Sequence, residues 1–201
     1  IRTPHGIIFH TGDWKLDRTP LVGEPTDEEK IRSLGREGVR ALICDSTNAF
    51  REGRSPSEAD VAESLKAIIA KAKRRVAVTT FASNVARIRA IAEAAKATRR
   101  HLVVAGRAMH RVIQVAMETG YLPQDFRYLD QDQFAYLEPD EVLMLCTGSQ
   151  GEPRAALSRI AEGEHPDLRL GQGDLVIFSS RTIPGNEKAV TRVQNNLALL
   201  G

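Results

Sequence analysis

Polar and basic residues follow four apolar segments of this chain, at the places where strands are expected to end. These junctions combine hydroxyl, amide and guanidinium groups with glycines that leave main-chain N–H groups accessible, the donors by which proteins bind phosphate. Helix capping and turn formation explain any single junction equally well. Four junctions on one sheet edge favour a phosphate-bearing ligand. The candidate residues are Ser83, Asn84, Arg87, Arg107, Thr147, Gly148, Ser149 and Gln150.

Two aspartates suggest metal chemistry. Asp13 and Asp45 each follow an apolar segment, where a carboxylate either binds a divalent metal or caps a turn. The five histidines form no H-x-H or H-x-x-x-H pair, whereas catalytic zinc normally takes three protein ligands with histidine prominent. A metal centre would therefore need ligands from outside this chain. The sequence also has no Walker loop, dinucleotide fingerprint, G-x-S-x-G elbow or C-x-x-C pair.

Short apolar segments alternate with helical patterns, which predicts an α/β fold with a mostly parallel sheet flanked by helices. The apolar segments are rich in Val, Ile and Leu at both alternating positions, as in strands covered on two faces. The expected strands are Ile7–His10, Ala41–Cys44, Val76–Thr80, Leu102–Ala105, Val142–Cys146 and Leu175–Ser179.

Capping signals and apolar spacing locate the helices. Ser55 to Glu58 has the pattern of a capping box, with proline at the first helical position. In the helix after Ser83, Val85, Ile88 and Ile91 are expected to face inward, and Arg87 and Arg89 to point elsewhere. Further helices are expected over Asp27–Arg36, Ala108–Thr119, Pro153–Glu162 and Asn186–Leu199, with an irregular segment over Tyr121–Pro139.

Composition indicates a globular protein, with 42% hydrophobic and 27% charged residues. No apolar stretch is long enough to cross a bilayer, and Cys44 and Cys146 are expected to be buried free thiols in a reducing compartment. The net charge of +2 hides a basic block over residues 71–111, with 11 Lys and Arg against one acid. Such clustering favours a polyanionic partner, although a solvated basic face is the commoner explanation.

Six motifs together resemble the metallo-β-lactamase/β-CASP nucleases, and most closely the ribonuclease J branch. They are HTGDWK, ICDSTN, TTFASNVARI, GRAM, TGSQGEP and IPGNE. The resemblance implies that residues 1–26 end a metallo-β-lactamase domain and residues 27–201 form the β-CASP domain, with the Pro- and Gly-containing segment 20–26 at the boundary. It also implies that the chain is a fragment, inactive alone. Its departures from the family pattern are Ala108, where relatives often have serine, and Trp14, where phenylalanine is common.

The resemblance further implies a hydrolase with two Zn²⁺ ions, or Mn²⁺ or Mg²⁺, that activate water against an RNA phosphodiester. Asp13 matches a bridging metal ligand and Asp45 an acid beside the catalytic site. The eight candidates named above would hold the 5′-phosphate and first bases of single-stranded RNA. The implied activity is 5′→3′ exonuclease and endonuclease cleavage in RNA decay and rRNA maturation, by a cytoplasmic, homo-oligomeric enzyme without membrane attachment.

Three alternatives stay open. The first is that the chain serves only as a non-catalytic nucleic-acid-binding module, whose affinity would fall steeply with salt if phosphate contacts dominate. Some β-CASP relatives process DNA instead of RNA. A flavodoxin-like nucleotide binder suits the fold but would need a phosphate loop that the sequence does not show.

Overall fold

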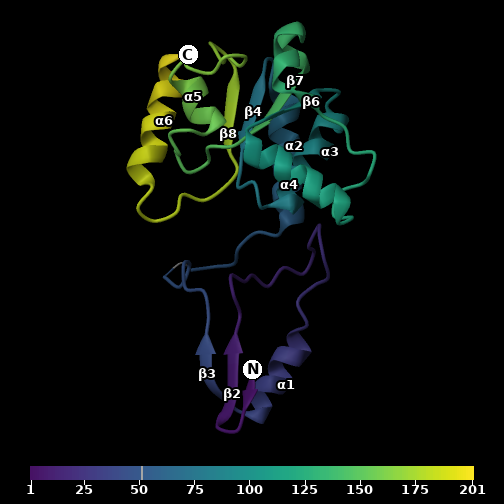
Figure 1. Ribbon diagram of the computed structural model, residues 1–201, viewed down its shortest axis with the longest axis vertical. Coiled ribbons are helices and arrows are strands. Elements are labelled where there is room, and N and C mark those ends of the chain that lie inside the picture. Colours follow the sequence, from purple (N-terminus) through teal and green to yellow (C-terminus); the bar gives the residue numbers. More distant parts are fainter. Residues whose placement is uncertain (51) are drawn as a thin grey trace. The chain divides into compact units, whose positions relative to one another are not determined.

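The computed structural model describes residues 1–50 and 52–201, which divide into two compact units, Ile1–Val61 and Ala62–Gly201. Each unit has its own sheet (Figure 1). The domain boundary expected after Thr26 concerns the whole protein and stays a prediction, and the division between the compact units falls after Val61.

The first unit contains a three-stranded sheet in the order β1-β2-β3 and one helix that lies wholly within it. Strands β2 and β3 are parallel, with His10 opposite Ile43, whereas β1 is antiparallel to β2. Asp27 begins the helix by accepting a hydrogen bond from the amide of Lys30 at 2.8 Å. The elements are β1 (Arg2–Thr3), β2 (Gly6–His10), α1 (Glu28–Glu37) and β3 (Val39–Ile43).

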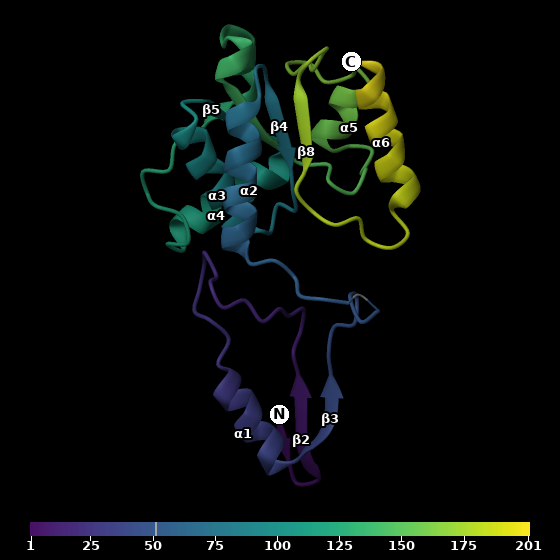
Figure 2. The same ribbon diagram turned by 180° about the vertical axis from the view of Figure 1, so that it is seen from behind.

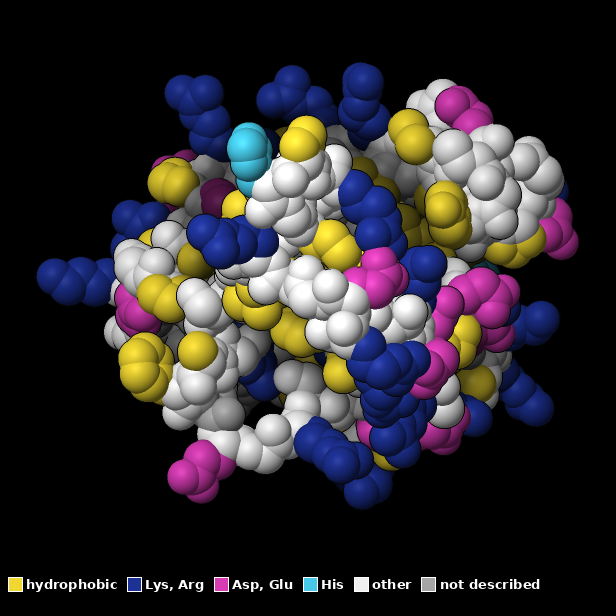
Figure 3. Space-filling model, turned by 90° about the horizontal axis from the view of Figure 1, so that it is seen from below, with side chains coloured by type: hydrophobic (Ala, Val, Ile, Leu, Met, Phe, Trp, Pro, Cys, Tyr) yellow, Lys and Arg dark blue, Asp and Glu magenta, His cyan; other side chains and the backbone are white. Residues whose placement is uncertain are grey.

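Strand β3 is not covered on both faces, so that expectation is wrong for this strand. Leu42 and Ile43 are 58% and 51% exposed, because α1 buries none of its own residues against the sheet. Cys44 follows them and is exposed, which contradicts the expected burial of its thiol. Figure 3 shows one face of the molecule, on which hydrophobic side chains lie at the surface among basic and acidic ones.

The capping box of α2 (Glu58–Lys71) lies two residues later than expected. The hydroxyl of Ser57, and not that of Ser55, accepts the amide of Asp60 at 3.0 Å. The carboxylate of Asp60 accepts the amide of Ser57 at 3.0 Å, which completes the reciprocal pair. Pro56 therefore precedes the helix, and its carbonyl accepts a hydrogen bond from Lys15. The sequence contains two overlapping capping-box patterns, which begin at Ser55 and at Ser57. The structure forms the second one.

The second unit contains a five-stranded parallel sheet in the order β6-β5-β7-β4-β8. This confirms the α/β class and the parallel sheet. Five of the six expected strands lie within one residue of their predicted ends, while β6 falls inside the segment expected to be irregular. The strands are β4 (Val76–Thr79), β5 (His101–Ala105), β6 (Leu129–Asp130), β7 (Val142–Cys146) and β8 (Leu175–Phe178).

Helices cover both sides of this sheet. Helices α5 and α6 pack together on one side, and α3 and α4 contact each other and β5 on the other (Figures 1 and 2). The helices are α3 (Val85–Ala97), α4 (Arg107–Glu118), α5 (Ala156–Ala161) and α6 (Glu187–Leu199), with short 3₁₀ turns η1 (Gln131–Tyr136) and η2 (Pro139–Glu141). Among the helices that the structure describes, none is both long and apolar enough to span a membrane.

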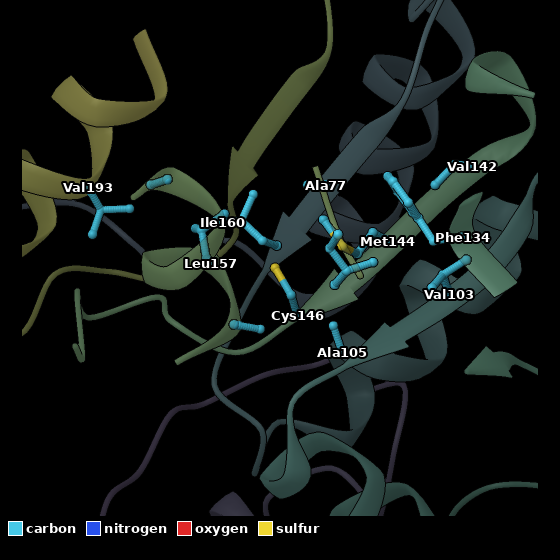
Figure 4. Packing of buried hydrophobic residues seen from close by; sticks show 13 residues of the cluster. Ala77, Val103, Ala105, Phe134, Val142, Met144, Cys146, Leu157, Ile160 and Val193 are labelled. Atoms are coloured by element: carbon cyan, nitrogen blue, oxygen red, sulfur yellow. The ribbon is translucent and has the colours of Figure 1, made fainter. Parts of the chain in front are cut away.

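The core centres on β7, in which every residue is buried. Alternation along the strand places Val142, Met144 and Cys146 in one cluster with Leu157 and Ile160 of α5 (Figure 4). The neighbours of these residues along the strand face the opposite side. Burial raises the pKa of the Cys146 thiol to about 12, so this thiol is buried and free, as expected.

The strand order fixes where a ligand cleft is expected. The chain leaves β5 through α4 towards β6, at one edge of the sheet, and leaves β7 through α5 towards β8, at the other. Since β5 and β7 are neighbours, their outgoing connections diverge between them. In open parallel sheets, ligands bind at such a switch point, outside the carboxyl ends of the strands.

Candidate nucleic-acid interface

A cleft of about 560 Å³ lies at this switch point. The ends of β4, β5 and β7 and the first turn of α4 contribute its walls. It contains the positive side chains of Arg107, Arg111 and Arg154 against the carboxylate of Glu152. Its lining residues are Thr80, Phe81, Ala82, Gly106, Arg107, Ala108, Arg111, Thr147, Gly148, Ser149, Glu152, Arg154 and Ala155.

Gly106 lets β5 and β7 approach closely at the cleft. A Cβ atom there would lie 2.4 Å from the hydroxyl oxygen of Thr147, and the backbone has φ +104°. The hydroxyl of Thr147 also accepts the amide of Ala156 at 3.2 Å, and its carbonyl accepts that of Leu157 at 3.0 Å. Thr147 therefore fixes the start of α5 as well as the floor of the cleft.

Residues with main-chain donors line the cleft beside these side chains. The amides of Gly148 and Ser149 have no acceptor within the part of the chain that the structure describes. Gly106 precedes α4 without a side-chain cap, which leaves the first amides of this helix without side-chain acceptors. Consecutive free amides and a helix amino end both favour a bound anion. The cleft thus combines three guanidinium groups with main-chain donors, as phosphate binding requires.

Two of the predicted ligand residues instead hold the segment 179–186 in place. Gln150 is 6% exposed, and its carbonyl oxygen accepts the amide of Ile183 at 2.8 Å. Its amide nitrogen donates to the carbonyl of Arg181 at 2.8 Å. Arg87 is 8% exposed and donates to the carbonyl and hydroxyl of Ser179 at 2.7 and 2.6 Å. The expectation that Arg87 points away from the buried face of α3 is therefore wrong.

The remaining candidates lie at the start of α3. Asn84 caps this helix by accepting the amide of Arg87 at 3.0 Å. Ser83 is exposed one residue earlier, next to Ala82 of the cleft. All eight candidates thus lie along the carboxyl edge of the sheet, but four of them, Arg107, Thr147, Gly148 and Ser149, line one cleft. Arg154 also lines it and was not predicted; its place just beyond the TGSQGEP motif was the available signal.

Replacing Gln150 by leucine should release the segment 179–186. We expect the amide of Ile183 to exchange with solvent at least about tenfold faster, because it loses a buried acceptor worth roughly 1.5 kcal/mol. Hydrogen exchange measured by mass spectrometry checks this. Gln150→Glu is the matched control, since it keeps the acceptor for Ile183, and protection that persists in both variants would contradict the assigned role.

The two aspartates follow neighbouring strands at the carboxyl edge of the first unit's sheet. Asp13 follows β2 and Asp45 follows β3, and the amide of Thr11 donates to the carbonyl of Ile43 at 3.0 Å. Asp13 is exposed. Hydrogen bonds from the hydroxyl (2.6 Å) and amide (2.9 Å) of Thr47 lower the pKa of the Asp45 carboxyl, which favours its deprotonated form.

These carboxylates do not make a complete metal site. In residues 1–50 and 52–201, no three His, Cys, Asp or Glu side chains lie close enough together to hold a metal ion. Two carboxylates suit part of a divalent site, because hard cations prefer oxygen ligands. The residues present therefore fit a metal only if other parts of the protein supply further ligands.

Comparison with known proteins agrees with the α/β fold and the parallel sheet of the second unit. Residues 73–197 match the family model described as "Ribonuclease J, beta-CASP domain", so the second unit is a β-CASP domain. Proteins named Ribonuclease J from Sinorhizobium meliloti and Thermus thermophilus are 53% and 45% identical to the chain. These matches cover 98% and 100% of it, and 35% of each relative. The chain belongs to the ribonuclease J family and spans about a third of the length of these relatives.

Proposed function

We propose that this chain is the part of a ribonuclease that supplies an RNA-binding wall and two acidic residues of the catalytic centre. The cleft between β5 and β7 carries the proposal, because it combines Arg107, Arg111 and Arg154 with free main-chain amides at the switch point of the sheet. A terminal phosphate would be held by charge-assisted hydrogen bonds there. Relatives named Ribonuclease J support RNA as the polymer.

In this proposal Asp13 and Asp45 act at the reaction centre of the whole protein. Asp13 would be a ligand of a divalent metal, Zn²⁺ or Mn²⁺, and Asp45 would lie beside it. A bound metal would supply activation of the attacking water and neutralisation of charge on the phosphate. The residues of this chain would orient the RNA and hold negative charge at these two carboxylates. Exonuclease and endonuclease cleavage, in RNA decay and rRNA maturation in the cytoplasm, belong to the same proposal, as does assembly into homo-oligomers.

The direct test uses the whole protein with matched substrates. Single-stranded RNA with a 5′-monophosphate should be degraded in the presence of Zn²⁺ or Mn²⁺, and faster than the same RNA with a 5′-hydroxyl. DNA of equal sequence should persist. If DNA is degraded as fast as RNA, the proposed preference for RNA is wrong. A lack of any cleavage would favour a nucleic-acid-binding module instead.

Arg107→Ala should reduce the preference for a 5′-phosphate by about tenfold or more, since a hydrogen bond to a charged group contributes roughly 1.5–3 kcal/mol. The ratio of kcat/KM for phosphorylated and hydroxyl-ended RNA measures it. Lys66→Ala removes an equal charge from the exposed face of α2 and serves as control. An unchanged ratio in the Arg107 variant would remove this residue from the phosphate site.

A further inference from the structure

Most of the basic block, residues 71–111, lies away from the proposed RNA-binding cleft between β5 and β7, which we call the RNA cleft. Only Arg87, Arg107 and Arg111 belong to the carboxyl edge of the sheet. Seven others end α2 or α3, or directly precede β4 or β5, and so lie at the opposite, amino edge. These are Lys71, Lys73, Arg74, Arg75, Lys96, Arg99 and Arg100. The basic block therefore cannot be explained by one phosphate site.

Fold stability explains part of this second group. Lys71 and Lys96 lie in the last turns of their helices, where positive charge offsets the helix dipole. Arg74 and Arg75 pair with the nearly buried carboxylate of Asp174 at 3.4 and 3.8 Å. These contacts do not account for Arg100, which lines a separate cleft nearby together with Lys96.

That cleft lies between α3, the start of β5 and the segment 123–129, and we call it the α3 cleft. Its volume is about 540 Å³, within the range of small-molecule sites. Half-buried aromatic rings of Phe126 and Tyr128 line it, with centroids 6.2 Å apart, beside the aliphatic side chains of Leu102 and Leu129. It shares no lining residue with the RNA cleft. An aromatic and aliphatic wall of this size suits a planar ring.

The α3 cleft is also positively charged. Arg89, Lys96, Arg100 and Arg127 line it, against the two carboxylates of Glu93 and Asp125. Lys96 and Arg127 are exposed.

Arg100 strengthens this positive field. Arg100 is 9% exposed, and its guanidinium donates to the main-chain carbonyls of Ala72, Arg74 and Val142 at 2.7–3.1 Å. Within the described residues it has no carboxylate at ion-pair distance, and burial lowers its pKa without discharging it. Its hydrogen bonds are to neutral carbonyls, and the carboxylate of Asp140 acts on its charge without forming an ion pair, so Arg100 adds positive potential at the cleft wall.

We propose that the α3 cleft binds a nucleotide unit, with the base against Phe126 and Tyr128 and the phosphate near Lys96 and Arg127. Stacking on aromatic rings combined with cations is how proteins hold single nucleotides without reading sequence. The unit comes from a free nucleotide or from a strand of RNA. This site is separate from the proposed RNA cleft and does not depend on the proposed cleavage. An acidic peptide would match the charge of the cleft but has no planar ring to stack against Phe126 and Tyr128.

Chemical protection of Lys96 tests the site directly. The whole protein is acetylated in limiting reagent with AMP, with a ten-nucleotide oligoadenylate, with inorganic phosphate, with a polyglutamate peptide, or alone. Each lysine is quantified by mass spectrometry. Lys66 and Lys73, outside the cleft, are internal controls. We expect AMP to slow acetylation of Lys96 at least threefold and leave the controls unchanged.

The arms distinguish the sources of the ligand. Stronger protection by the oligonucleotide at equal nucleotide concentration identifies a strand of RNA as the occupant, and equal or weaker protection a free nucleotide. Protection by inorganic phosphate equal to that by AMP would overturn a nucleotide site. So would protection by a polyglutamate peptide but not by AMP, or an unchanged rate at Lys96.

Charge reversal separates this site from the RNA cleft. In Arg127→Glu, the AMP concentration that half-protects Lys96 should rise about tenfold, equivalent to about 1.4 kcal/mol. Lys66→Glu, a matched reversal on α2, should leave it unchanged, as should Arg107→Ala in the RNA cleft. If Arg107→Ala abolishes protection of Lys96 while Arg127→Glu does not, the α3 cleft is not the site, whatever the outcome for RNA cleavage.

Discussion

Asp13→Ala in the whole protein should lower the rate of RNA cleavage by roughly a thousandfold or more, a loss of about 4 kcal/mol of transition-state stabilisation. In the proposed function, Asp13 as a metal ligand would act on charge that develops in the reaction, whereas the basic cleft would hold most of the RNA. RNA affinity should therefore change by less than about threefold. Single-turnover cleavage and equilibrium RNA binding, measured on the same preparation, check both parts.

The control for Asp13 is Glu24→Gln, which removes an exposed carboxylate from the same unit. Because Asp13 is itself exposed, its replacement should leave the melting temperature of the metal-free protein unchanged, which separates loss of chemistry from loss of fold. The bound metal should fall in Asp13→Ala and persist in Glu24→Gln, as measured by elemental analysis. Full turnover with Asp13 replaced would contradict its assignment as a ligand.

The sheet of the second unit could be predicted because its strands satisfy one simple rule. A strand buried on both faces needs apolar residues at consecutive positions, and Val142–Cys146 has nothing else. β6 was missed because Leu129 and Asp130 are too few to show a period. Its pairing with β5 comes from tertiary contact. The exposure of β3 was missed because its apolar residues match the pattern of a buried strand. In the described residues, no other element covers Leu42 and Ile43.

The candidate site was predictable in position but not in the role of each side chain. Strand ends and glycines located the edge, since both are properties of local sequence. Whether a polar side chain points at a ligand or at the protein depends on the neighbouring loop, which is distant in sequence. Arg87 bonds Ser179, and Gln150 bonds the main chain of Arg181 and Ile183. Sequence spacing contains no information about such pairs.

Gly151→Ala should destabilise the five-stranded unit by about 3 kcal/mol or more. At φ +73° an alanine is strained by roughly 1–2 kcal/mol. Its Cβ would also lie 2.4 Å from the carbonyl carbon of Ala189 and 2.7 Å from the amide nitrogen of Val190, in the first turns of α6. Overpacking of this kind adds roughly 1–3 kcal/mol, and main-chain atoms cannot move aside as a side chain can.

Gly163→Ala is the matched control, because Gly163 has φ +72° and open space around its Cβ position. The Gly163 variant has the backbone strain alone. The difference in unfolding free energy between the two variants therefore isolates the contact between Gly151, in the segment after β7, and α6. Labelling of the buried Cys146 thiol as a function of urea, with Cys44 replaced by serine, reports opening of the sheet in each variant. Equal loss in both variants would show that backbone conformation, and not the approach of α6, requires glycine at position 151.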